Sequence, residues 1–67
     1  MWIKKENATY QIISANIHEE SDKYQVWVER PTGKSLKIFE SKENQLAHEV
    51  KDAIDFALKS SIPVLEL

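Results

Sequence analysis

The sequence contains no cysteine, only one glycine and two prolines among its 67 residues. The absence of cysteine excludes disulfide bonds and thiolate-ligated metal sites. Small secreted domains commonly depend on such crosslinks, so this absence favours a reducing, cytoplasmic location. The scarcity of glycine and proline predicts few and short loops. A chain of this length has room for a single domain, residues 1–67, with a core of marginal size.

Long hydrophobic stretches are also missing. No apolar run approaches the roughly 20 residues that a membrane-spanning helix needs. Residues 1–6 carry charges where a secretory signal would need an apolar stretch, so no signal peptide is expected. The formal net charge of −2 predicts no overall attraction to nucleic acid or to anionic membranes. The hydrophobic content of 42% is typical of a folded globular domain.

Three segments have the alternating pattern and the residue types of β-strands. They are residues 9–17, 23–30 and 35–40. In the second segment Val26 and Val28 flank Trp27, so the valines and the tryptophan are predicted to lie on opposite faces of a sheet.

Turn chemistry predicts the register of these strands. Residues 30–33 (Arg-Pro-Thr-Gly) are typical of a type I turn, after which Gly33 takes the left-handed conformation of a glycine bulge. The predicted cross-strand pairs of this hairpin are Val28–Leu36 and Val26–Ile38. A loop over residues 19–22 closes the first hairpin. Its predicted pairs are Ile17–Tyr24, Ala15–Val26 and Ile13–Val28.

A helix is predicted over residues 42–59, with Ser41 as its N-cap. Apolar residues recur there at steps of three and four and form one stripe: Leu46, Val50, Ala53, Ile54, Ala57 and Leu58. Pro63 prevents the helix from continuing and leaves residues 62–67 as an extended tail. The predicted fold class is α+β, a three-stranded antiparallel meander followed by one helix that packs on one face of the sheet.

Such a helix covers one face of the sheet and leaves the other face open. By the predicted register this open face displays Ile12, Trp27 and Phe39, and Phe56 lies off the apolar stripe of the helix. An apolar surface of this kind favours contact with another chain, either a different protein or a second copy whose sheet face completes the core. In the alternative arrangement, the two ends of the chain fold over these side chains.

No motif in the chain predicts catalysis or a cofactor. Residues 31–35 contain the Gly-Lys-Ser end of a phosphate-binding loop, but Val28 occupies the position of its first glycine and a strand follows in place of a helix. His18 adjoins several carboxylates but has no second histidine at metal-ligand spacing. The chain also has little volume for a substrate pocket. We therefore expect no enzymatic activity, no metal, no cofactor and no small-molecule substrate.

Nucleic-acid binding is the alternative function. Arg30, Lys34 and Lys37 lie on one predicted hairpin, next to aromatic side chains that could stack on bases. The order of elements resembles that of the arm-binding domains of phage-type integrases and, with an added N-terminal helix, of double-stranded-RNA-binding domains. These resemblances imply phosphate contacts from the basic hairpin. The lysine cluster that begins the last helix of those RNA-binding domains has no counterpart at residues 41–44.

The order of three strands and a helix, together with residues 50–58, also resembles the HicB-type antitoxins over most of the chain. The Pro-x-x-x-Gly-Cys-type segment between the strands and the helix of those antitoxins is missing here. The resemblance implies a small protein that acts by binding one partner. The function expected from the sequence is a non-enzymatic protein-binding module, with an inhibitor, an antitoxin-like protein or a bacterial or phage accessory protein as candidate roles.

Overall fold

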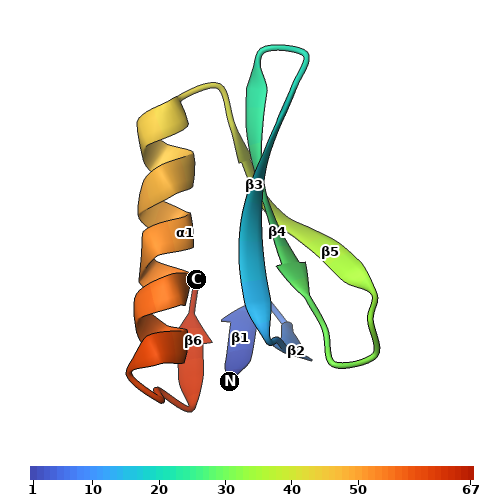
Figure 1. Cartoon of the computed structure of the whole chain (residues 1–67), viewed down its shortest axis with the longest axis vertical. Helices are drawn as coiled ribbons and strands as arrows, with labels where there is room; N and C mark the ends of the chain where they lie inside the picture. Colours follow the sequence, from blue (N-terminus) through green and yellow to red (C-terminus); the bar gives the residue numbers. More distant parts are fainter.

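The structure, a computed structural model of residues 1–67, has one helix and two three-stranded sheets (Figure 1). In chain order the elements are β1 (Trp2–Lys5), β2 (Ala8–Gln11), β3 (Ser14–Glu20), β4 (Lys23–Glu29), β5 (Ser35–Ser41), α1 (Asn44–Lys59) and β6 (Val64–Glu66). Sheet A has the strand order β2-β1-β6 and sheet B the order β3-β4-β5. The α+β class is confirmed, and sheet B is the predicted meander followed by the helix. Sheet A was not predicted.

Sheet A joins the two ends of the chain. β1 pairs with β2 in antiparallel orientation and with β6 in parallel orientation. The Trp2 N–H donates to the Pro63 carbonyl and the Leu67 N–H donates to the Lys4 carbonyl, both at 2.9 Å. The predicted extended tail is therefore a strand, and its partner is the N-terminal segment, for which no strand was predicted.

The single strand predicted over residues 9–17 is divided between the two sheets. At the start of β3 the Ile13 N–H donates to the Glu29 carbonyl at 2.9 Å, although Glu29 already pairs with Ser14. Ile13 and Ser14 therefore both lie opposite Glu29. This arrangement is a β-bulge, and it disturbs the alternation of side chains along the strand. As a result Ile12 is 1% exposed and Ile13 is 53% exposed, the reverse of the prediction.

A two-residue turn joins β3 to β4 in place of the predicted loop over residues 19–22. Ser21 and Asp22 have positive φ values of 50° and 64°, and two left-handed residues in succession are the type I′ geometry that suits a β-hairpin. The ladder contains Ala15–Val28 and Ile17–Val26, so the predicted pairs Ile17–Tyr24, Ala15–Val26 and Ile13–Val28 are wrong. The register shift is of two residues, and since side chains alternate with a period of two, the valines stay on the predicted face.

The turn between β4 and β5 has the predicted geometry. Gly33 has a φ of 88°, and its N–H donates to the Arg30 carbonyl at 2.9 Å. The Arg30 N–H in turn donates to the Lys34 carbonyl at 2.8 Å. The predicted pair Val28–Leu36 is confirmed.

A second β-bulge lies in β5. Val26 pairs with Phe39 and the next residue, Trp27, pairs with Lys37, so Ile38 is the inserted residue. The predicted pair Val26–Ile38 is therefore wrong. Because of the bulge, Phe39 lies on the side of Val26, where it packs against the core and not on the open face.

The helix α1 begins two residues later than predicted and ends at the predicted residue, Lys59. Its N-cap residue is Glu43, which makes no side-chain capping bond. Ser41, the predicted N-cap, ends β5, and its Oγ accepts a hydrogen bond from the Glu43 N–H at 3.0 Å. The apolar face is rotated from the predicted stripe, so that Leu46 is 41% exposed. The buried helical residues are Ala47, Ile54 and Ala57.

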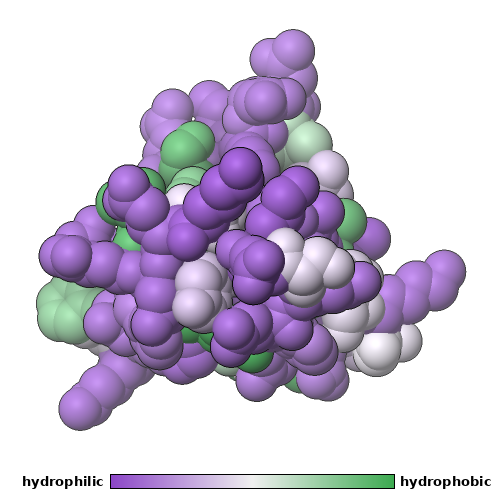
Figure 2. Space-filling model, turned by 90° about the horizontal axis from the view of Figure 1, so that it is seen from above, coloured by the Kyte–Doolittle hydropathy of each residue, from purple (hydrophilic) through white to green (hydrophobic).

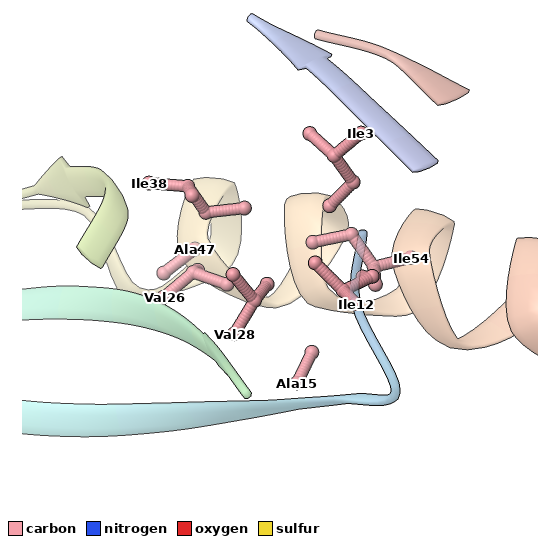
Figure 3. Close-up of a cluster of buried hydrophobic side chains, with 8 residues drawn as sticks. All are labelled: Ile3, Ile12, Ala15, Val26, Val28, Ile38, Ala47 and Ile54. Atoms are coloured by element: carbon pink, nitrogen blue, oxygen red, sulfur yellow. The ribbon is translucent and has the colours of Figure 1, made fainter. Parts of the chain in front are cut away.

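The core lies between α1 and the two sheets (Figure 3). The helix packs across β3, β4 and β5 and also contacts β6. Figure 3 shows Ile3 of sheet A pointing toward Ile12 and Ile54. The buried cluster consists of Ile3, Ile12, Ala15, Val26, Val28, Ile38, Ala47 and Ile54. The one helix is neither long enough nor apolar enough to cross a membrane.

Candidate functional site

The face of sheet B that α1 leaves uncovered is polar. We call it the open face, and it consists of Ser14, Asn16, His18 and Glu20 from β3, Lys23, Gln25, Trp27 and Glu29 from β4, and Ser35, Lys37 and Glu40 from β5. Trp27 is the one large apolar side chain among them. The predicted placement of Ile12 and Phe39 on this face is wrong, because the two bulges turn both side chains to the other side of the sheet, where Ile12 is part of the core and Phe39 packs against it.

The Trp27 indole is held in place by its neighbours on the open face. Its Nε1 donates a hydrogen bond to Gln25 Oε1 at 2.9 Å. The His18 imidazole lies against it, with 6.0 Å between ring centroids and an interplanar angle of 58°. Trp27 is half-buried. Since its N–H is satisfied within the chain, the orientation of the ring does not depend on a partner.

Gln25 is a buried polar side chain, 8% exposed, between this indole and a carboxylate. Its Oε1 accepts from Trp27, and its Nε2 donates to Glu40 Oε1 at 2.9 Å. A buried amide needs partners for both its oxygen and its nitrogen, and Gln25 has both. The result is a continuous hydrogen-bonded chain from Trp27 through Gln25 to Glu40.

Glu40 is the charged end of this chain. Lys37 Nζ lies 3.4 Å from its Oε1, and Lys23 Nζ lies 3.8 Å from its Oε2. The hydrogen bond from Gln25, together with these two lysines, lowers the pKa of the Glu40 carboxyl below its ordinary value of 4.5. Glu40 is therefore an acceptor-only carboxylate at neutral pH, which fixes Gln25 with its amide nitrogen toward Glu40 and its oxygen toward Trp27.

Two shallow recesses flank the hydrogen-bonded chain. One, of about 270 Å³, is lined by Asn16, His18, Glu20, Gln25, Trp27 and Ser35. The other, of about 210 Å³, is lined by Glu20, Ser21, Lys23, Gln25 and Glu40. Both are smaller than the clefts of roughly 300–1,000 Å³ that hold small-molecule ligands.

The three basic residues of the alternative function do not form one basic surface. The Arg30 guanidinium lies over the ring of Tyr10 in β2, 5.7 Å from its centroid. Lys37 pairs with Glu40. Only Lys34, on the exposed turn, has neither an ion pair nor an aromatic ring as partner.

Phe56 is separated from the open face. It is 65% exposed and follows the buried Ile54 by two residues, which places it on the side of α1 turned away from the core. The open face lies on the opposite side of sheet B from the helix. Of the predicted contact residues Ile12, Trp27, Phe39 and Phe56, only Trp27 therefore lies on the open face.

His18, Gln25 and Glu40 are the residues of this site that the sequence reasoning did not assign. Alternation alone predicts that Gln25 shares the face of Trp27, because it precedes Trp27 by two residues, but it does not predict the hydrogen bond between them. Glu40 could not be predicted in this way, since its position opposite Gln25 depends on the bulge at Ile38.

Two further hollows lie away from the open face and carry no cluster of reactive groups. A recess of about 400 Å³ separates the β1–β2 turn from β5. Another, of about 430 Å³, lies beside Trp2 and Pro63. No group of three or more histidine or carboxylate side chains is placed to hold a metal ion.

Comparison of the chain with protein-family models, curated proteins and solved structures finds no match. The candidate functional site is the open face, where Gln25 and His18 hold Trp27 in place.

Proposed function

We propose that this chain is a non-enzymatic protein-binding module that contacts a partner protein through the open face, with Trp27 as the central contact. The observation that supports this most is the half-buried indole fixed by Gln25 and His18. Tryptophan is among the residues most enriched at energetically dominant interface positions. A side chain that is already ordered loses little further entropy when a partner binds.

The surroundings of Trp27 favour a partner with polar and basic side chains. The three carboxylates Glu20, Glu29 and Glu40 outnumber the two lysines, Lys23 and Lys37, on the open face. The adjacent β3–β4 turn adds Asp22. Seen from the end that carries this turn, the molecule is mainly hydrophilic (Figure 2). Electrostatic complementarity of this kind gives an interface its specificity and its association rate.

The charge arrangement supports a protein partner over a nucleic acid. Phosphate binding needs cations that are free to replace counterions. Here Arg30 packs on Tyr10 and Lys37 is paired with Glu40, which leaves Lys34 as the one free cation of the predicted basic set.

The test combines site-directed crosslinking with two alanine variants. A photo-reactive amino acid at Ser35, which lines the recess beside Trp27, should give one discrete protein adduct in cells of the source organism. Trp27→Ala should remove this adduct, whereas Phe56→Ala, which truncates an exposed aromatic residue away from the open face, should leave it unchanged. With the identified partner, Trp27→Ala should weaken binding about 30-fold, equivalent to about 2 kcal/mol.

Two outcomes would contradict the proposal. One is an adduct that persists in Trp27→Ala at the level of the unmodified chain. The other is the same adduct from a photo-reactive residue at Gln45, which is exposed on α1. Adducts to RNA or DNA that weaken with salt would favour the nucleic-acid alternative.

A further inference from the structure

The outer edge of β3 has main-chain groups without partners. Sheet B ends at β3, and the two-residue turn makes Glu20–Lys23 the first hydrogen-bonded pair of the hairpin. Hydrogen-bonded pairs alternate along an antiparallel ladder, so the N–H and C=O groups of Ala15, Ile17 and Glu19 point away from β4. No hydrogen bond outside the ladders involves these groups.

The other strand edges are short or blocked. β5 is interrupted by its bulge, and the Lys5 ammonium donates to the Ile38 carbonyl at that point. β2 has four residues and β6 has three. β3 has seven residues and contains no proline, lysine or glycine. Proteins commonly protect sheet edges by bulges, prolines and charged side chains. On β3 the bulge at Ile13 and the two glutamates lie at opposite ends, so residues 15–18 between them remain a template for another strand.

We propose that a second copy of this chain occupies this edge, with the two β3 strands antiparallel about a two-fold axis at Ile17. This register pairs all seven residues of β3. Ile17 faces its own equivalent, and the remaining pairs across the axis are Ala15–Glu19, Asn16–His18 and Ser14–Glu20. The outward groups of Ala15, Ile17 and Glu19 then bond to one another, as the ladder pattern requires.

The positions of the charged residues of β3 support this register and a second copy of the chain as the partner. The two carboxylates of β3, Glu19 and Glu20, lie together at its C-terminal end. In a two-fold antiparallel pair they face Ala15 and Ser14 of the second copy, so no like charges lie directly opposite. A shift of two residues toward the turn would place Ile17 opposite Glu19 and shorten the ladder. The edge is thus complementary to itself, as a two-fold interface must be.

The dimer would join two copies of sheet B into one continuous sheet. The open faces of both copies then lie on the same side, and each carries its Trp27. The dimer forms through the edge of the sheet and not through its open face, so it is independent of the proposed protein contact.

Cysteine crosslinking tests the pairing and its register, because the chain contains no cysteine of its own. Asn16→Cys and His18→Cys are made in separate chains and mixed under mild oxidation. In the proposed register these positions form a non-hydrogen-bonded pair with Cα atoms about 4.5 Å apart, within the range that a disulfide bridges. Either residue lies only diagonally from its own equivalent, at about 7–8 Å, where a disulfide does not form without backbone movement.

The mixture should give a heterodimeric disulfide as the main crosslinked product, and each variant alone should stay largely uncrosslinked. Equal crosslinking of the separate and mixed variants would overturn the register. Sedimentation of the unmodified chain as a monomer even at millimolar concentration would overturn the dimer and leave the edge to a different protein.

A proline variant distinguishes loss of pairing from loss of folding. Glu19 is exposed, and its N–H points away from β4, so Glu19→Pro removes no hydrogen bond within the chain. Its circular dichroism should match that of the unmodified chain while the dimer is lost. A folded Glu19→Pro variant that still dimerises would overturn the proposal.

Discussion

Trp27 and Gln25 share one face of β4 and are joined by a hydrogen bond of 2.9 Å from the indole Nε1 to the amide Oε1. The relation follows from strand geometry, since residues two apart point to the same side. Gln25 is buried by its neighbours, whereas Trp27 keeps part of its surface in solvent. A buried amide therefore orients a partly exposed ring.

Gln25→Met should loosen this ring. Methionine keeps most of the volume of glutamine but removes the bonds to Trp27 and Glu40. We expect a loss of stability of about 1 kcal/mol and a red shift of Trp27 fluorescence. The spectra are recorded in a Trp2→Phe background, so that all tryptophan fluorescence comes from Trp27. The control is Gln45→Met, at an exposed helical position, which should change stability by less than about 0.5 kcal/mol. Equal effects of the two substitutions would contradict the role of Gln25.

The stabilising effect of Glu40 should depend on pH. Its pKa is lowered in the folded chain, chiefly by the hydrogen bond from Gln25 and also by Lys37 and Lys23. Because the folded pKa lies below the ordinary value of 4.5, this stabilisation is fully present above 4.5 and is lost as the pH falls through the folded pKa. The stability difference between the unmodified chain and Glu40→Gln should therefore be largest at neutral pH and decrease in acid.

Urea unfolding at a series of pH values measures this difference. Glu66→Gln serves as the control, because Glu66 makes no ion pair or side-chain hydrogen bond. A difference for Glu40→Gln that stays constant, or that grows as the pH falls, would contradict the assigned direction.

Two adjacent isoleucines test the break between β2 and β3. Ile12 is 1% exposed and Ile13 is 53% exposed. Ile12→Val should cost about 0.5–1.5 kcal/mol, because it removes a buried methylene group. Ile13→Val should change stability by less than about 0.5 kcal/mol. Because the same substitution is made at neighbouring positions, each variant is the control of the other. A lower denaturant midpoint for Ile13→Val than for Ile12→Val would contradict the bulge.

Gly33→Val should cost more than about 1 kcal/mol, because the φ of 88° strains a β-branched residue. A Cβ atom at this position meets no neighbouring atom within 4 Å, so the cost is conformational and not a clash. Gly33→Asn should lose less, because asparagine tolerates left-handed backbone better. Equal losses in the two variants, measured by thermal unfolding, would argue against a backbone origin.

The parts of the fold that local chemistry determines could be predicted from the sequence. The alternation around Val26 and Val28 gave the correct face for both valines and for Trp27. The Pro-Thr-Gly segment gave the correct turn and the pair Val28–Leu36. The periodicity of the helix gave its C-terminal end, although its buried face proved to be rotated.

The remaining features depend on contacts between distant residues. Thr9 to Ile13 contain no glycine or proline to mark a break, so one strand was the natural prediction where the chain leaves sheet A for sheet B. Neither bulge has a glycine, and the bulge at Ile38 alone moves Phe39 to the core side and Glu40 to the open face. Sheet A requires the two ends of the chain to pair, which no local pattern indicates.

The two tryptophans allow the proposed contact to be tested in a single spectrum. Trp2 lies in sheet A and Trp27 on the open face, so their indole N–H signals in a nitrogen–proton correlation spectrum report two separate surfaces. When the partner identified by crosslinking from Ser35 is added, the Trp27 signal should shift or broaden and the Trp2 signal should stay in place. A shift of Trp2 alone, or no shift of Trp27 at a saturating concentration of that partner, would contradict binding through the open face.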